Sequence, residues 1–327
     1  MKNFRTLFSE KIEEFNKNNL QKQVEKRLEQ LNLPTEAVSQ NDVLTSIGQE
    51  RLMGECNLMS ISYFYKGLEI SKSVCRIVNA RGEKIEALGT GFLVGPHLLM
   101  TNWHVIGSRM EARIFQAEFE YEFQSEGKMS KSYLFKLDPS LFFLTDEELD
   151  YTIVGVNPIS QTDPSRKLDF YPTNILKSTR DKILVKEAVS IIQHPRGRPK
   201  MIAIRDNEVS KIEEPFIYYN TDTDQGSSGS LVANDQWDIV ALHHRSIPKK
   251  NENGKIMLSK GGILRKEEDK EFIIWEANRG VLMDCILKDI AKRNVRVYEK
   301  NIREELLKEF DPVEEEGGYT LPKRHIG

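Results

Sequence analysis

The chain has 327 residues, with 47 Lys or Arg and 50 Asp or Glu, and its formal net charge at pH 7 is −3. Acidic and basic residues are intermixed, which argues against a nucleic-acid-binding surface. No stretch is apolar enough to span a membrane, and the first residues lack the apolar core of a signal peptide. We therefore expect a cytoplasmic protein that binds neither nucleic acid nor membrane, built as one large folded unit with extensions.

Three cysteines occur, Cys56, Cys75 and Cys285. Their odd number and irregular spacing differ from the disulfide framework of a small secreted protein, so we expect reduced thiols. No second Cys or His lies at ligand spacing from them. The sequence therefore predicts neither a metal site nor another cofactor.

Apolar residues recur at steps of three to five along residues 1–33, with charged residues between them. This amphipathic pattern predicts a helix that ends at Pro34, and Thr35 is a candidate start for a second one. We assign residues 1–55 to a helical extension. It either docks on the main unit and stabilises it, or acts as an adaptor for a regulatory protein.

Residues 63–78 predict a short helix followed by a strand at 74–78. Residues 89–107, GTGFLVGPHLLMTNWHVIG, predict a hairpin turning at a Gly-Pro pair. His104 falls just past the second strand of this hairpin. A histidine in this place is commonly a surface residue.

Alternating apolar and polar side chains predict further strands at 112–123 and 133–137. Asp150 stands directly before the apolar run at 151–156, which predicts another strand. An aspartate before a strand is commonly a turn residue.

Two apolar β-branched runs within residues 188–205 flank His194, so this stretch predicts a hairpin with a Pro/Gly turn. His194 could serve as a second base, but we interpret it as a turn histidine with a structural role.

The stretch 221–244, TDTDQGSSGSLVANDQWDIVALHH, predicts a strand, a polar turn and a second strand. A tight turn of glycines and serines at 226–230 precedes them and presents the hydroxyl of Ser228. Taken alone, such a loop is commonly only a surface feature.

The C-terminal third begins with a charged, Gly-rich loop at 247–271, which either selects substrates or is a solvated insertion. Amphipathic patterns then predict helices at 279–293 and 301–310. Residues 311–327 predict a disordered tail.

Ser228, His104 and Asp150 together have a chemical meaning that none has alone. A serine hydroxyl is a poor nucleophile until a base removes its proton, and the base needs a third group to orient it. Three such residues at strand edges and in a tight turn therefore predict nucleophilic catalysis.

The motifs that carry these residues are GTGFLVG with TNWHV, LDYTIV, and DQGSSGSLV. They resemble trypsin-like serine peptidases of the chymotrypsin fold, and are closer to the bacterial glutamyl-endopeptidase-like branch of intracellular type than to digestive trypsins. The resemblance implies a mainly β protein with two antiparallel six-stranded β-barrels, an N-terminal helical extension and a C-terminal helix. It implies a peptidase domain at 56–298, followed by a helix and a disordered tail at 299–327.

The resemblance also implies a role for each site residue. His104 would be the general base and acid, Asp150 its orienting carboxylate and Ser228 the nucleophile. The nearby carboxylates Asp146, Glu147 and Glu148 are alternatives to Asp150, with Asp146 as the fallback. The backbone N–H groups of Gly226 and Ser228 would form the oxyanion hole. The implied activity is that of a serine endopeptidase that cleaves intracellular proteins through an acyl-enzyme.

Two cues for the specificity pocket conflict. Asp222 stands where trypsin-type enzymes keep a carboxylate for Arg or Lys, whereas Thr223 and His243 stand where glutamyl endopeptidases receive an acidic side chain. We favour a basic residue before the scissile bond, because an unpaired Asp222 would repel glutamate; a loop acid turned away from the pocket is the alternative.

A catalytically silent peptide-binding module on a peptidase fold is the second hypothesis. An esterase or lipase is disfavoured, because the chain lacks both the G-x-S-x-G elbow and the Ser-Asp-His order of that class.

Overall fold

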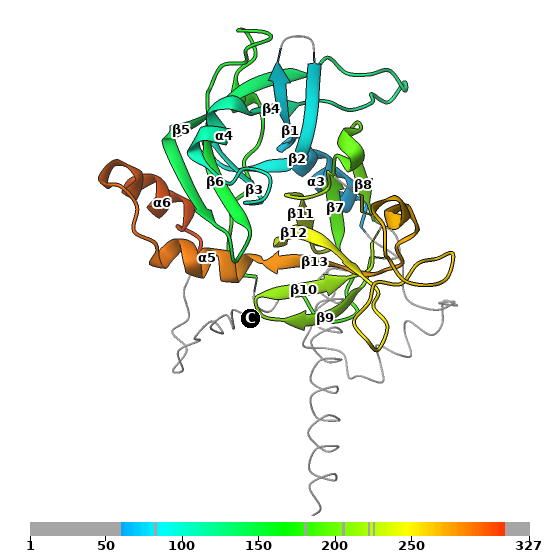
Figure 1. Cartoon of the computed structure of the whole chain (residues 1–327). Helices are drawn as coiled ribbons and strands as arrows, with labels where there is room; N and C mark the ends of the chain where they lie inside the picture. Colours follow the sequence, from blue (N-terminus) through cyan, green and yellow to red (C-terminus); the bar gives the residue numbers. More distant parts are fainter. Residues whose placement is uncertain are drawn as a thin grey trace, which may run out of the picture.

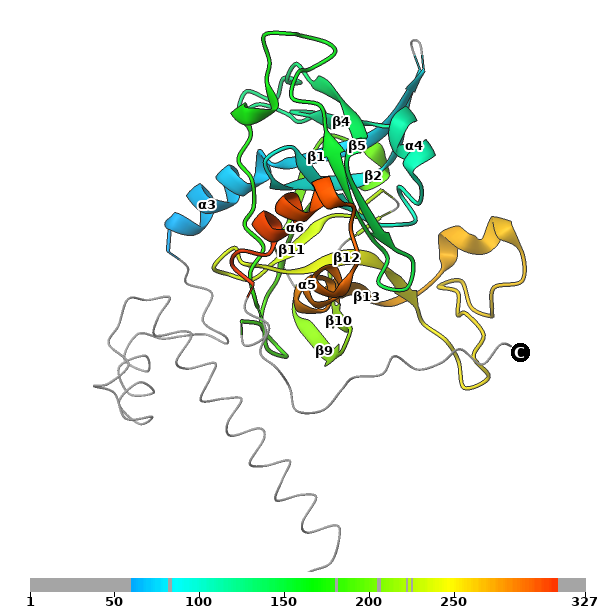
Figure 2. The same ribbon diagram turned by 90° about the vertical axis from the view of Figure 1, so that its left-hand side faces the viewer.

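The computed structural model describes residues 60–310 except 82–83, 180–181, 205–206, 222 and 225, and it leaves the side chains of residues 81, 84, 267 and 268 undescribed. The extension expected at 1–55, the tail expected at 311–327 and Asp222 therefore lie outside the described residues. The fold is mainly β, with one sheet above the other and helices at the periphery (Figure 1 and Figure 2).

The first sheet is a closed antiparallel barrel with the strand order β1-β2-β3-β6-β5-β4. Side chains alternate between the inside and the outside of such a barrel, and the inner ones here are buried and apolar. This barrel confirms the six-stranded barrel expected for the first half of the chain. Its strands are β1 (Val74–Arg81), β2 (Lys84–Gly95), β3 (Leu98–Thr101), β4 (Gln116–Phe119), β5 (Tyr133–Asp146) and β6 (Tyr151–Val156).

A helix replaces part of one predicted strand in this barrel. The strand expected at 112–123 is limited to β4, because α4 (Arg109–Ile114) comes before it. Ser108 caps this helix, since its side chain accepts a hydrogen bond from the Glu111 N–H. A helix of 6 residues shows little periodicity in a sequence. The alternation of apolar and polar residues therefore predicted a strand where the chain forms the end of a helix.

The second sheet has seven strands in the order β8-β7-β11-β12-β13-β10-β9 and is not closed. The structure therefore does not confirm the expected second six-stranded barrel. β8 and β9 form opposite edges, and the two ends are linked by an isolated bridge between Ala188 and Glu208 and by backbone hydrogen bonds between residues 186–189 and residues 207–209. The strands are β7 (Ser190–Gln193), β8 (Met201–Ala203), β9 (Val209–Glu213), β10 (Phe216–Tyr219), β11 (Leu231–Ala233), β12 (Ile239–Pro248) and β13 (Trp275–Leu282).

Helices cover the ends of the two sheets. The short helix expected near residue 63 is confirmed as α3, and the helix expected at 301–310 forms as α6. The helix expected at 279–293 begins later, because residues up to 282 pair with β10 and β12 as β13. Besides α4, the α-helices are α3 (Ser62–Ser71), α5 (Met283–Lys292) and α6 (Lys300–Leu306), and the 3₁₀ turns are η2 (Leu168–Phe170), η3 (Pro195–Gly197), η4 (Glu267–Phe272) and η5 (Val297–Glu299).

One hydrophobic cluster joins the two sheets and fixes their relative position. It combines barrel residues with residues of β11 to β13 and with the buried face of α5. The Tyr151 hydroxyl adds a polar link by donating to Asp289 of α5 at 2.7 Å. The edges of β3, β6 and β12 are thereby held together. Members of the cluster include Phe92, Met100, Tyr151, Leu231, Leu242, Met283, Ile286 and Ile290.

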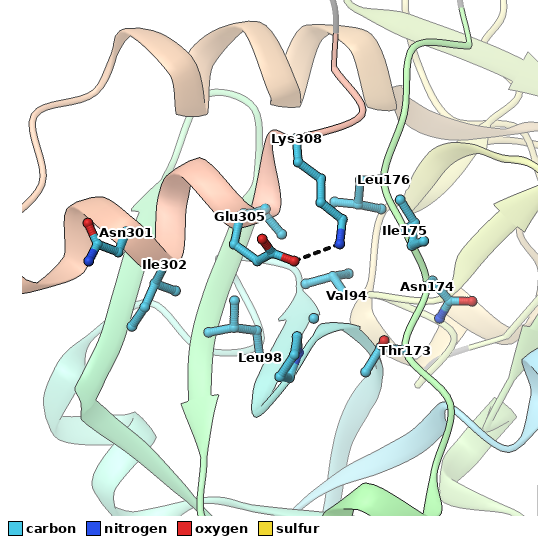
Figure 3. A pocket seen from close by; sticks show the side chains of 13 residues that line it. Val94, Leu98, Thr173, Asn174, Ile175, Leu176, Asn301, Ile302, Glu305 and Lys308 are labelled. Carbon is cyan, nitrogen blue, oxygen red and sulfur yellow. Dashed lines mark hydrogen bonds and ion pairs between the residues drawn. The ribbon is translucent and has the colours of Figure 1, made fainter.

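A cavity of about 260 Å³ lies between α6 and the turn that joins β2 to β3 (Figure 3). Val94, Leu98 and Ile302 supply apolar walls, and Lys308 pairs with Glu305 at 2.6 Å on its rim. None of the residues expected at the catalytic site lines it.

The described part of the chain has no helix long and apolar enough to cross a membrane. Within the same residues, no group of three or more His, Cys, Asp or Glu side chains is arranged to hold a metal ion. Neither Cys75 nor Cys285 forms a disulfide within the described residues, and burial raises the pKa of Cys75.

Candidate active site

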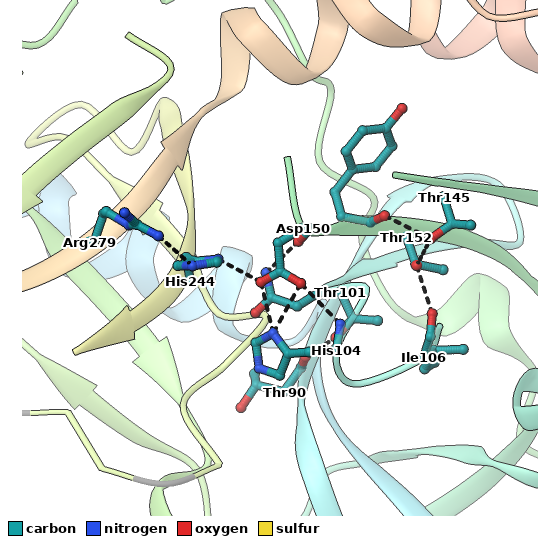
Figure 4. Close-up of polar contacts among 11 residues, drawn as sticks. Thr90, Thr101, His104, Ile106, Thr145, Asp150, Thr152, His244 and Arg279 are labelled. Carbon is teal, nitrogen blue, oxygen red and sulfur yellow. Dashed lines mark hydrogen bonds and ion pairs between the residues drawn. The ribbon is translucent and has the colours of Figure 1, made fainter. Parts of the chain in front are cut away.

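Strand pairing brings His104 and Asp150 to one edge of the barrel. β3 and β6 are antiparallel neighbours with Thr101 opposite Thr152, so a residue just past β3 lies beside one just before β6. His104 Nδ1 lies 2.8 Å from Asp150 Oδ2 and 3.0 Å from Oδ1, and the His104 N–H donates to Oδ1 at 3.0 Å (Figure 4). The carboxylate therefore fixes both the ring and the backbone of His104.

The Asp150 backbone takes a conformation that the sequence did not reveal. Its φ is 49°, in the left-handed region that few non-glycine residues adopt. The Asn102 side chain donates to the Asp150 carbonyl at 2.8 Å and supports this turn. Asp150 is 3% exposed, whereas 41% of the His104 side chain is exposed. A buried carboxylate thus orients an imidazole whose other edge is open to solvent.

Burial alone would raise the pKa of the Asp150 carboxyl. The hydrogen bonds from His104 and His244 oppose this and hold the pKa below its ordinary value. The group is therefore ionised at neutral pH. Asp146, the fallback from the sequence, instead pairs with Arg293 and accepts from the Leu149 N–H at 2.7 Å.

Two residues that the sequence analysis did not single out complete this cluster. His244 Nδ1 lies 2.6 Å from Asp150 Oδ2, and Arg279 Nη2 lies 2.8 Å from His244 Nε2 (Figure 4). They come from β12 and β13 of the second sheet. One signal was present: two adjacent histidines in a strand point to opposite faces, so either His243 or His244 had to face the site.

The turn that carries Ser228 is fastened to the first barrel. The Thr90 N–H donates to the Ser228 carbonyl at 2.8 Å, and Thr101 Oγ1 donates to the Thr90 carbonyl at 2.7 Å. Gly229 has a φ of 85°, and a Cβ there would collide with the Thr90 carbonyl and Thr101 Oγ1. Only glycine fits this close approach. Ser228 is thereby held near the strand that leads to His104.

Neither the N–H of Gly226 nor that of Ser228 donates a hydrogen bond within the described residues. Within the same residues, Ser228 Oγ forms no hydrogen bond with His104 Nε2. The structure thus brings the serine loop to the His104–Asp150 edge without closing the serine–histidine contact.

His194 lies behind this loop and not beside Asp150. Its N–H donates to Thr90 Oγ1 at 3.0 Å, and Thr90 Oγ1 donates to the Gly226 carbonyl at 2.8 Å. A Cβ built on Gly226 would lie 2.8 Å from the His194 carbonyl oxygen. His194 is 0% exposed, and its Nδ1–H donates to the Arg198 carbonyl at 3.0 Å. These contacts support the interpretation of His194 as a structural turn residue.

Of the residues expected in the specificity pocket, Asp222 lies outside the described residues. Thr223 Oγ1 donates to Asn278 Oδ1 at 2.5 Å and lies 3.2 Å from Ser246 Oγ, so these three form a neutral polar group. His243 is 2% exposed, and its Nδ1 shares a hydrogen bond of 2.7 Å with the Tyr219 hydroxyl.

The two buried histidines predict loss of stability in acid. Burial lowers the pKa of His194 and of His243 to about 3, whereas a histidine in an unfolded chain has a pKa near 6.5. Between these values the unfolded chain binds protons that the folded chain does not. The free energy of unfolding should therefore decrease as the pH is lowered through this window, by up to about 1.4 kcal/mol per pH unit for each ring.

Urea unfolding at several pH values between 7 and 4 measures this dependence. His243→Asn removes one titrating ring and keeps an acceptor for Tyr219, so its stability should depend less steeply on pH than that of the wild type. Equal slopes for the two proteins would contradict the assignment.

The chain is similar to a curated protein of Sinorhizobium fredii (strain NBRC 101917 / NGR234), the uncharacterised protein y4fB, with 35% identity over 263 residues. The match spans 75% of this chain but only 39% of that protein.

Solved structures that resemble this one include two bacterial proteins. Rv3671c from M. tuberculosis H37Rv, an inactive form with serine replaced by alanine, has a TM-score of 0.42 and 14% identity over 68% of this chain and 88% of its own. The serine endoprotease from Yersinia pestis has a TM-score of 0.44 and 16% identity over 72% of this chain and 67% of its own. Residues 89–242, which include His104, Asp150 and Ser228, match the family model of the trypsin-like peptidase domain.

Proposed function

We propose that this protein is a serine endopeptidase in which Ser228 is the nucleophile, His104 the general base and Asp150 the orienting carboxylate. The paired hydrogen bonds between His104 Nδ1 and the Asp150 carboxylate carry this proposal. In these bonds His104 Nδ1 carries the proton and donates it to Asp150. The lone pair of His104 Nε2 is then available to accept a proton.

In the proposed reaction, Ser228 Oγ attacks the peptide carbonyl carbon while its proton passes to His104 Nε2. The N–H groups of Gly226 and Ser228 hold the resulting oxyanion, and each such donor lowers the barrier by about 3 kcal/mol. His104 then protonates the leaving amine as the C–N bond breaks. Water, deprotonated by His104, attacks the acyl ester and releases the acid, and Ser228 regains its proton.

The open serine–histidine contact favours a second candidate function, a peptide-binding module on a peptidase fold. In the peptidase, that contact would close when substrate binds, as catalytic hydrogen bonds commonly tighten in the bound complex. In the binding module it would stay open.

The substrates we propose are proteins or peptides within the cell, and a regulatory partner would bind through residues 1–55. The neutral group formed by Thr223, Ser246 and Asn278 supports a pocket wall that accepts polar side chains. The preference for a basic residue still depends on Asp222. Cleavage of a peptide library distinguishes it from the acidic preference implied by Thr223 and His243.

Labelling with a fluorophosphonate probe tests the activated nucleophile, because Ser228 Oγ must displace fluoride from phosphorus. We expect the wild type to be labelled and Ser228→Ala not to be. The rate of labelling should rise between about pH 5 and pH 8, since the base must be a neutral imidazole.

A rate that is flat over this range would contradict the role of His104. If neither protein is labelled but both bind peptides with equal affinity, the binding module is the better description.

A further inference from the structure

We propose that His244 is a positioning residue of this site: a neutral imidazole that donates Nδ1–H to Asp150 and is kept in this tautomer by Arg279. Its effect on catalysis rests on the function proposed above. The protonation state of His244 does not depend on that function.

The two contacts of the His244 ring fix where its proton lies. Nδ1 is 2.6 Å from Asp150 Oδ2, and Nε2 is 2.8 Å from Arg279 Nη2. A guanidinium group has only N–H donors, so Nε2 must be the acceptor of that pair and carry no proton. Nδ1 then carries the proton and donates it to the carboxylate. A charged His244 would point an N–H at another N–H donor.

Arg279 is held in place for this contact. Its guanidinium lies over the Phe216 ring, 4.0 Å from the centroid, which is a favourable cation–π geometry. Its backbone pairs with Arg245 on β12 and Tyr218 on β10. The arginine is therefore part of the sheet framework, and its hydrogen bond to His244 does not depend on a mobile surface side chain.

Charged groups face His244 from every neighbouring element. Burial lowers the pKa of His244, the hydrogen bond to Asp150 raises it, and the charges of Arg279 and Arg245 lower it. The net pKa lies below the ordinary value. The remaining titratable groups nearby are His104 from the β3 side, His243 on β12 and Tyr218 on β10, which contacts Arg279.

Keeping His244 neutral has a consequence for His104. The Asp150 carboxylate carries one negative charge and accepts hydrogen bonds from both rings. If His244 became positive, the two imidazoliums would compete for that charge, and His104 would accept the Ser228 proton less readily. With Arg279 in place, His104 is the one of these two rings whose Nε2 can accept the Ser228 proton. Arg279 thus directs the proton to one of two available imidazoles.

Two-bond ¹H–¹⁵N correlation spectra of the full-length protein with ¹⁵N-labelled histidine test the tautomer without requiring activity. The His244 signals are identified by their loss in His244→Asn. We expect protonated Nδ1 and unprotonated Nε2 in the wild type at about pH 6, where an unperturbed histidine is mostly charged. In Arg279→Met both nitrogens should carry protons at that pH. A wild-type ring protonated at Nε2 overturns the proposal.

The pH dependence of fluorophosphonate labelling tests the catalytic consequence. The wild type should show one ionisation. Arg279→Met should show two and be labelled about ten-fold more slowly at about pH 6. Arg245→Met is the matched control: it removes a neighbouring charge but not the donor to Nε2, so one ionisation should remain. A profile of Arg279→Met identical to that of the wild type overturns the proposal.

Substitution of His244 itself separates positioning from packing. Asparagine places an N–H donor near the position of Nδ1 and cannot titrate, so His244→Asn should be labelled within a few-fold of the wild-type rate and keep one ionisation. Leucine has a similar size and no donor, so His244→Leu should lose about ten-fold at every pH, the typical effect of a lost hydrogen bond to a charged group. Equal rates for the two variants would assign His244 a packing role only. If the wild type is not labelled at all, the peptidase proposal fails, and the spectra still decide the tautomer.

Discussion

Asp150→Asn should lower kcat/KM on a cleavable peptide by about 10⁴-fold, the loss typical of a serine-peptidase triad that loses its carboxylate. The geometry gives the reason. Asp150 accepts hydrogen bonds from the backbone N–H and Nδ1 of His104 and from Nδ1 of His244. A carboxamide has one oxygen acceptor and one NH₂ donor, so it cannot satisfy all three. It would favour the His104 tautomer that carries its proton on Nε2, which cannot accept the serine proton.

Steady-state kinetics at pH 7 to 8 measures this effect. Asp146→Asn is the matched control, because Asp146 lies four residues earlier, pairs with Arg293 and does not contact His104. We expect it to retain kcat/KM within a few-fold of wild type. A loss of less than about ten-fold in Asp150→Asn would exclude Asp150 as the orienting carboxylate.

Arg76→Met should lower the free energy of unfolding by about 3–5 kcal/mol, because it leaves a buried carboxylate without its charge partner. Arg76 Nε and Nη2 contact Glu118 Oε2 at 2.9 and 2.5 Å, and the Glu118 side chain is 3% exposed. The guanidinium also lies 3.7 Å from the Tyr121 ring centroid and donates to the Gly197 carbonyl at 2.5 Å. One side chain thus links the first barrel to the turn behind Gly226.

Urea unfolding and thermal melting at neutral pH measure this loss. A domain of this size should melt about 10 °C lower for such a change. The double variant Arg76→Met with Glu118→Leu should recover much of the stability, because no uncompensated charge remains buried. A double variant no more stable than Arg76→Met would show that the cost arises from packing and not from the charge of Glu118.

The sequence by itself was sufficient for the motifs and for several strands of the first barrel, whereas the closed barrel was implied by the resemblance to a family. Turn glycines, strand-edge positions and short apolar runs depend on local conformation, so they indicated where His104, Asp150 and Ser228 stand along the chain. They also gave the hairpin that precedes His104. Preference for Asp150 over Asp146 needed the resemblance to a family, since both carboxylates precede the same strand.

Only the tertiary structure decided what meets at Asp150. His244 reaches the carboxylate because β12 lies beside the barrel edge, and Arg279 reaches His244 because β12 and β13 pair in one register. The same non-local pairing left the second sheet open and extended β13 to residue 282, where periodicity had indicated a helix. Strand register and sheet closure depend on contacts between residues far apart in the chain, so a local sequence pattern does not determine them.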